Sequence, residues 1–436
     1  MLGLNKKLKK AIFLLQIGTF LEYFDLMLFV FMAVILNEVF FPQFDVFTNS
    51  LLAAFTYCAT YALKPFSALL FGYISEKVGR KHTVIITTII MAISCIIIAN
   101  APTYAQIGIT ASWIVTLCRG LQGVSSVGES KGEALSIVNR IEASSSKYQA
   151  IGLIDLSGML GMTAAVIVAE VGIFLDINWR IIFWTGALIA LMCATARVMW
   201  DQAPDPIFAK HKQLTKLAKA EKVPDLSSDQ PVWETKVSRG VSVAYFMVFC
   251  GWPFCYYFSY VYCGGILKNQ FYYTKETLIH HNLIVSLFSV AGLFIWVWLT
   301  KKINPLIVLK TKLIIYVVFL SMVPWLLSMA KSQLIIIIIQ VLGMVFGHPT
   351  IPATSVFLSH FPIFKRLHYT RFITAFSHFT LYIIASFGLV YAVKVFGNYG
   401  ILLISLPIPL VLLLWLLHFE KLEKYAVEYR SMEQIS

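Results

Sequence analysis

The chain has 436 residues, of which 58% are hydrophobic and only 13% are charged, and its mean hydropathy is +0.77. A soluble globular protein carries about 25% charged residues, so this composition excludes a soluble domain and indicates a polytopic membrane protein. The net charge of +13 would also suit a nucleic-acid-binding protein. However, most lysines and arginines fall in segments predicted to be cytoplasmic, which is the positive-inside pattern of membrane proteins. We therefore expect no nucleic-acid partner.

Twelve apolar segments are long enough to cross a bilayer, which takes roughly 17–25 residues. Their approximate bounds are 11–35, 48–74, 83–100, 106–128, 148–172, 181–200, 240–262, 278–300, 306–329, 332–358, 372–393 and 398–418. A polar segment at 201–239 divides them six and six. The sequence therefore predicts an all-α membrane protein with an N-terminal six-helix bundle (1–200), a cytoplasmic linker (201–239), a C-terminal six-helix bundle (240–418) and a short cytoplasmic tail (419–436).

The first apolar segment follows four lysines, as in a signal peptide, but it is too long and contains two acids, so we interpret it as a retained first helix. With both termini cytoplasmic, five basic residues fall on the external side: Arg180, Lys268, Lys275, Lys331 and Lys394. Lys64, Arg119 and Lys131 are taken as the intramembrane basic residues of the first half. The seven cysteines lack metal-like spacing, and we expect neither a metal nor a cofactor.

Two carboxylates interrupt the first span, in the stretch GTFLEYFDLML (18–28). Glu22 and Asp25 are three residues apart, a spacing that places both on one side of a helix. An ionised acid at mid-bilayer costs roughly 2.5–3.5 kcal/mol on insertion scales. We therefore expect both side chains to face a polar cavity rather than lipid.

The loop after the second span reads GYISEKVGRK (72–81). Gly72 permits close helix approach, Glu76 lies at a helix end, and Gly79 allows a tight reversal. Lys77 and Arg80 are basic residues that keep the loop cytoplasmic. These five residues are candidates for a cytoplasmic gate, although an ordinary positive-inside loop would also account for them.

A polar helical face runs along the fourth span, where Arg119, Gln122, Ser126, Glu129 and Glu133 follow steps of three or four residues. Intramembrane charges are functional by default, although Arg119 as a neutralised packing residue remains an alternative. The intramembrane acids all fall in the first half, so carboxylate-based proton coupling is predicted there. The candidates for coupling and cavity are listed here: Glu22, Asp25, Lys64, Arg119, Gln122, Glu129 and Asp155.

The second half contributes aromatic side chains instead. Trp252, Tyr256 and Tyr260 share one helical face and, with Tyr23 of the first span, form a candidate aromatic wall for a quaternary ammonium group. Such a stripe is usually explained by packing or by an aromatic belt at the membrane interface. His348 and His378 lie in predicted spans, where a hydrogen-bonded core role and proton transfer are both open.

Several of these motifs resemble those of the major facilitator superfamily. Residues 72–81 resemble its loop signature, with Glu76 where Asp is usual. Residues 118–134, the first-span Gly18, Glu22, Phe24 and Asp25, and KPFSALLFG (64–72) resemble the metabolite:proton symporter branch, and within it the proline/betaine carriers. The second-half loop VWLTKKINPL lacks the acid and the glycines of the signature, and His378 stands where the branch often has Asn.

The resemblance implies two six-helix bundles around a central cavity and a monomeric secondary transporter of the bacterial inner membrane, driven by a proton gradient rather than a cofactor. The expected function is proton symport of a small polar metabolite, such as proline or glycine betaine. An organic acid such as 2-oxoglutarate, shikimate or citrate is the alternative, since Lys64, Arg119 and Lys131 would pair with carboxylates. A membrane sensor that does not transport is a third hypothesis. No catalytic constellation is found, so an enzyme is not expected.

Overall fold

The computed structural model describes residues 6–42, 45–126, 145–199, 237–348, 351 and 353–433. Regular structure in these ranges is entirely helical. The first half contains α1 (Lys6–Phe40), α2 (Val46–Ala62), α3 (Lys64–Lys77), α4 (Arg80–Asn100), α5 (Tyr104–Ile107), α6 (Ile109–Ser126), α8 (Ser145–Phe174) and α9 (Trp179–Met199).

The second half contains α11 (Arg239–Phe249), α12 (Gly251–Tyr256), the π-helix η1 (Tyr257–Tyr262), α13 (Cys263–Gln270), α14 (Lys275–Leu299), α15 (Pro305–Ser328), α16 (Gln333–Gly347), α17 (Thr354–Ser359), α18 (Ile363–Ile383), the π-helix η2 (Ile384–Gly388), α19 (Leu389–Phe396), η3 (Gly397–Tyr399), α20 (Gly400–Ser405) and α21 (Pro407–Glu433). Helices that follow end to end, such as α2 with α3 or α11 through α13, form single membrane-length rods.

Each predicted span lies mostly on helix within the described residues, and the span 332–358 also contains non-helical residues between α16 and α17. Seven described helical segments are long and apolar enough to cross a membrane, and 179–192 and 333–347 form shorter apolar helices. The predicted linker lies outside the described residues up to position 236. In the predicted tail, α21 continues as a helix to Glu433.

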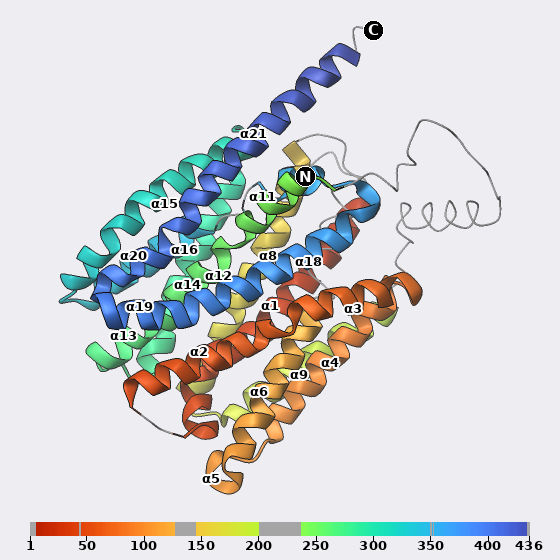
Figure 1. The fold of residues 1–436 in the computed structure, drawn as a ribbon. Coiled ribbons are helices and arrows are strands. Elements are labelled where there is room, and N and C mark those ends of the chain that lie inside the picture. Colours follow the sequence, from red (N-terminus) through yellow and green to blue (C-terminus); the bar gives the residue numbers. More distant parts are fainter. Residues whose placement is uncertain are drawn as a thin grey trace.

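The two halves form two groups of helices that meet along two seams (Figure 1). In one seam α8 packs along α14, and in the other α2 and α3 pack against α18. Within the first half, glycines allow the closest helix approaches. A Cβ at Gly161 of α8 would lie 2.0 Å from the carbonyl oxygen of Phe20 in α1, and one at Gly123 of α6 would lie 1.5 Å from that of Thr60 in α2. Small residues at helix contacts are the usual means of tight packing in lipid.

Both chain ends lie toward the same end of the helices (Figure 1), and the opposite end is called the distal end below. The distal turn between α1 and α2 is fixed by Asp45, whose Oδ2 accepts hydrogen bonds from the backbone N–H of Phe47 (3.0 Å) and of Thr48 (3.1 Å). Hydrogen bonds from the Thr48 hydroxyl and backbone hold the pKa of Asp45 below its usual range. This cap is the usual means of satisfying the first N–H groups of a helix.

Several rods are interrupted inside the membrane region, and three of these interruptions lie near the cavity or its neighbouring helices. Pro65, at the start of α3, separates it from α2, because proline removes a backbone donor. The π-helix η1 interrupts the rod of α11–α13, and there Gln340 Nε2 donates to the carbonyl oxygen of Ser259 (2.5 Å) while its Oε1 contacts His281 Nε2 (2.5 Å). The third interruption separates α16 from α17. Such breaks are common at functional sites.

Candidate functional site

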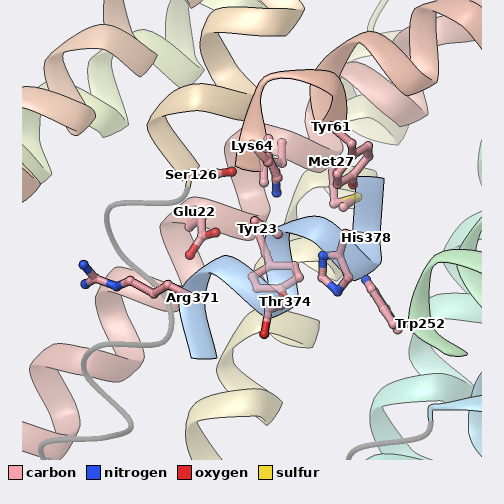
Figure 2. Close-up of a pocket in the computed structure, with 12 residues that line it drawn as sticks. Glu22, Tyr23, Met27, Tyr61, Lys64, Ser126, Trp252, Arg371, Thr374 and His378 are labelled. Carbon is pink, nitrogen blue, oxygen red and sulfur yellow. The ribbon is translucent and has the colours of Figure 1, made fainter. Parts of the chain in front are cut away.

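A cavity lies between the two halves, and both halves contribute to its wall (Figure 2). The first half supplies α1, the α2–α3 junction and the end of α6, and the second half supplies α12 and α18. The lining residues are Glu22, Tyr23, Leu26, Met27, Tyr61, Lys64, Ser126, Trp252, Arg371, Thr374, Ala375 and His378. A site formed by both halves changes whenever the halves move relative to each other.

Charged groups of both signs line one part of this cavity. Glu22 and Lys64 are both buried, at 7% and 8% exposure, and lie within electrostatic range of each other. Lys64 lies at the interruption before Pro65, and its Nζ is 4.6 Å from the centre of the Tyr61 ring. Arg371, 5% exposed, comes from α18 of the other half. Such an arrangement accepts a carboxylate and a cationic group together.

Aromatic rings line another part of the cavity. Trp252 lies beside His348, with ring centres 4.2 Å apart, and beside Tyr256 at 5.5 Å. Tyr61 stacks on Tyr382 at 3.7 Å, and its ring centre is 6.5 Å from that of His378. In Figure 2, Trp252, His378 and Tyr61 lie on the opposite side of Tyr23 from Glu22. The cavity therefore has a charged part and an aromatic part.

A second polar group lies directly behind the α1 wall of the cavity. Arg119, 1% exposed, donates from Nη1 to Gln122 Oε1 (2.8 Å) and to the carbonyl oxygen of Leu26 (3.5 Å), and its guanidinium lies 4.1 Å from the Phe29 ring centre. Asp25 is 4% exposed. Both Asp25 and Arg119 lie within electrostatic range of Cys95 of α4. Because the Leu26 side chain lines the cavity, this cluster is one residue layer from it.

Glu22 and Asp25 thus divide between two environments. A step of three residues falls about 60° short of a full helical turn, and this rotation separates the two side chains. Glu22 lines the cavity, whereas Asp25 is absent from its lining and points toward α9, where a Cβ at Gly186 would lie 3.6 Å from Asp25 Oδ1. Their predicted coupling roles remain predictions.

The other predicted residues are distributed as follows. Tyr23 and Trp252 line the cavity, whereas Tyr256 and Tyr260 are buried behind Trp252, and the Tyr260 hydroxyl is 2.9 Å from Ser286 Oγ. Asp155 of α8 is not among the lining residues but lies within electrostatic range of Tyr23, which is. Its Oδ2 accepts a hydrogen bond from Thr354 Oγ1 of the second half (3.4 Å).

The predicted gate is only partly described. Gly79 adopts φ +93° and begins α4, as a tight reversal requires, and Gly72 is buried within α3. Lys77 is exposed and its Nζ lies 4.4 Å from the Tyr73 ring centre. The side chains of Glu76 and Arg80 lie outside the described part of the chain, as do the whole of Glu129, Lys131 and Glu133.

Three buried cations were not singled out from the sequence. Arg371, Arg366 and Lys312 were counted only as cytoplasmic basic residues, but they are buried, at 5%, 6% and 0% exposure. For Arg371 the signal was present: positions 371, 374, 375 and 378 follow an i, i+3, i+4, i+7 pattern, which is one face of a helix, and all four line the cavity. Lys312 lies inside the predicted span 306–329.

The distal end is held closed by contacts between the halves. Glu38 of α1 forms ion pairs with Lys275 (2.6 Å) and Lys268 (3.6 Å). Glu170 of α8 lies 2.8 Å from His280 Nδ1 of α14. Further along the same end, Lys394 lies 3.8 Å from the Phe47 ring centre.

Within the described residues, no group of three or more His, Cys, Asp or Glu side chains could hold a metal ion. The described lining offers charged groups, hydrogen-bonding groups and aromatic rings for binding.

Comparison with known proteins gives the cavity a context. A family model described as Major Facilitator Superfamily matches residues 15–389. The chain is 27% identical over 300 residues to a proline/betaine transporter of Escherichia coli, covering 66% of this chain and 58% of that protein. It is 28% identical over 192 residues to an alpha-ketoglutarate permease of the same species, covering 42% and 44%. The chain thus matches about half the length of these relatives. In fold it is similar to the proton:xylose symporter XylE, with a TM-score of 0.73 at 13% identity, over 94% of this chain and 95% of that one.

Proposed function

Because this chain belongs to the major facilitator superfamily, whose members are membrane transporters rather than enzymes, we propose that it carries a small zwitterionic metabolite, such as proline or glycine betaine, together with protons. The observation that supports this most is the cavity between the halves, which combines a charged part with an aromatic part. We place the protein in a bacterial inner membrane as a monomer, with both termini cytoplasmic.

The two parts of the cavity suit the two ends of a zwitterion. Lys64 and Arg371 offer cationic partners for a carboxylate, and a buried charge needs such a partner. Glu22 attracts a cationic group, and Trp252 and Tyr61 add aromatic faces that attract quaternary ammonium groups. Lys64 and Arg371 belong to different halves and lie on opposite sides of Glu22 in Figure 2, so each half offers its own cationic partner.

Proton coupling is proposed for the acids of α1. Glu22 lies on the cavity within electrostatic range of Lys64, and Asp25 and Arg119 both lie within electrostatic range of Cys95. A carboxylate between a dry interior and a nearby cation changes its proton affinity when its surroundings become hydrated or its partner moves. Opening and closing of the cavity would therefore bind and release a proton at these positions.

An organic acid is the second candidate substrate, for a specific reason. Among the described lining residues, Lys64, Arg371 and His378 are basic or can become so, whereas Glu22 is the acid. A substrate with two carboxylates would use this excess of basic groups better than a zwitterion. The similarity to an alpha-ketoglutarate permease supports testing this class.

The deciding experiment is uptake by proteoliposomes of labelled proline, glycine betaine and 2-oxoglutarate, each with and without an inside-alkaline pH gradient and an inside-negative potential. One proton driven by about 100 mV delivers roughly 2.3 kcal/mol, which sustains about a fifty-fold accumulation of a neutral solute at 1.4 kcal/mol per decade.

We expect accumulation of proline or betaine that a protonophore abolishes. Accumulation of 2-oxoglutarate alone would select the organic-acid alternative. Uptake that depends on a sodium gradient instead would refute proton coupling, and no uptake of any of the three would refute the proposed substrate classes.

A further inference from the structure

The rod formed by α16 and α17 is broken in the membrane region, between Gly347 and Thr354. The last carbonyl groups of a helix have no partners within that helix. Inside a bilayer no water replaces them, so other parts of the protein must supply hydrogen-bond donors. The sequence at the break contains Pro349 and Pro352, which cannot donate from their backbone nitrogen.

Lys312 of α15 supplies donors at this break. Its Nζ donates to the carbonyl oxygen of His348 (2.6 Å) and to that of Ile351 (3.3 Å). The side chain is 0% exposed and is among the largest fully buried side chains in the described structure. Burial of an amine is costly unless it is hydrogen-bonded, so its place at these two carbonyl groups is specific. A cationic group also suits the carbonyl end of a helix.

The residue that Lys312 holds contacts the cavity wall. The His348 ring lies against Trp252, with ring centres 4.2 Å apart, and Trp252 lines the cavity. A second contact joins the same two rods, since Cys255 Sγ donates to the carbonyl oxygen of Gly343 (2.8 Å). Lys312 itself is absent from the cavity lining. Its influence on the cavity therefore passes through the backbone of His348.

We propose that Lys312 is a positioning residue for the substrate cavity: by binding the carbonyl groups at the α16–α17 break, it holds His348 where that ring fixes Trp252 in the cavity wall. This inference rests on the proposed function, because it takes the cavity as the substrate site. It separates Lys312 from the residues that touch substrate, such as Trp252.

The first test needs no substrate. Hydrogen–deuterium exchange is measured on the purified protein, on Lys312→Met, which keeps length but removes the donors, and on Lys310→Met. Lys310 is the matched control on the same helix, since it pairs with Glu420 of α21 (3.0 Å) rather than with the break. We expect about tenfold faster exchange in the peptide spanning residues 341–358 for Lys312→Met, the order expected for loss of one strong hydrogen bond, and no change there for Lys310→Met. Equal exchange in both variants overturns the proposal.

The second test is a double-mutant cycle on transport, using whichever of labelled proline, glycine betaine or 2-oxoglutarate the unmodified protein carries. We expect Lys312→Met and Trp252→Phe each to raise KM, Lys312→Met by about tenfold, with little change in maximal rate. The double variant should be no worse than the poorer single variant, since both act through one ring. Multiplying effects would leave Lys312 a purely structural residue and overturn only this inference. If none of the probes is carried, the proposed function fails and the inference fails with it.

Discussion

Glu38 offers the most direct test of how the distal end is closed. It is the first-half partner of two second-half lysines, with N–O distances of 2.6 Å to Lys275 and 3.6 Å to Lys268. Opening of the distal end must separate α1 from α13 and α14, and so must break both ion pairs. We predict that Glu38→Gln shifts the protein toward conformations open at this end.

The size of the shift follows from the exposure of the pairs. The three side chains are 38% to 52% exposed, and ion pairs at such sites contribute about 0.2–1 kcal/mol each. Loss of both pairs should therefore disfavour the closed conformation by about 0.4–2 kcal/mol. At 1.4 kcal/mol per decade, the ratio of open to closed protein rises about 2- to 30-fold. The contact between Glu170 and His280 does not involve Glu38 and is still present in the Glu38→Gln variant. The closed conformation therefore keeps part of its stabilisation.

The assay is labelling of a cavity cysteine by a membrane-impermeant maleimide. Ala375→Cys places the thiol in the cavity lining, and the six native cysteines that are described are buried. Labelling from the distal side should be about 2- to 30-fold faster when Glu38→Gln is added. The control is Glu420→Gln, which breaks the Lys310 ion pair (3.0 Å) within the second half and should leave the rate unchanged. An unchanged rate with Glu38→Gln, or an equal rise with Glu420→Gln, would refute the role of Glu38 in closure.

Three further predictions follow from the cavity and its packing. Glu22→Gln and Asp25→Asn should each abolish uphill uptake while leaving counterflow exchange measurable, because each removes a carboxylate that can bind a proton; persistent uphill uptake in the double variant would exclude both. Lys64→Gln should raise KM by about ten- to a hundredfold for a substrate with a carboxylate, because the buried charge loses a partner, and KM measured in proteoliposomes checks this. Gly123→Val should prevent folding into the membrane, since a Cβ there would lie 1.5 Å from the Thr60 carbonyl oxygen; a normal yield of monodisperse protein in detergent would contradict it.

The fold could be predicted because hydrophobic length is a strong and local signal. Each span was defined by a run of apolar residues, and the bilayer leaves the backbone of such a run little choice but helix. The interruptions were harder, since Pro65 and the π-helix η1 change the direction of a rod without ending its apolar run. The break before Thr354 was missed for the same reason, although Pro349 and Pro352 marked it.

The site could be predicted in part, because charge in an apolar segment is a signal of function. That signal identified Glu22 and Lys64 as candidate residues, and both line the cavity. It could not separate Glu22 from Asp25, because which side of α1 meets the cavity depends on the packing of α4, α8 and α9. Arg371 was missed because the predicted span began one residue later, so a cavity residue was assigned to a loop.

Four of the five basic residues on the external side of the predicted topology have a local contact that explains their position. Lysines are disfavoured on that side, so each one there should have a local reason. Lys268 and Lys275 bind Glu38, and Lys394 lies against the Phe47 ring, so three of these residues join one half to the other. Arg180 differs, since it donates to the carbonyl oxygen of Ala99 within its own half (2.8 Å). A cation that contradicts the charge rule and contacts the opposite half is therefore a candidate gate residue, and sequence alone provides the first of these two criteria.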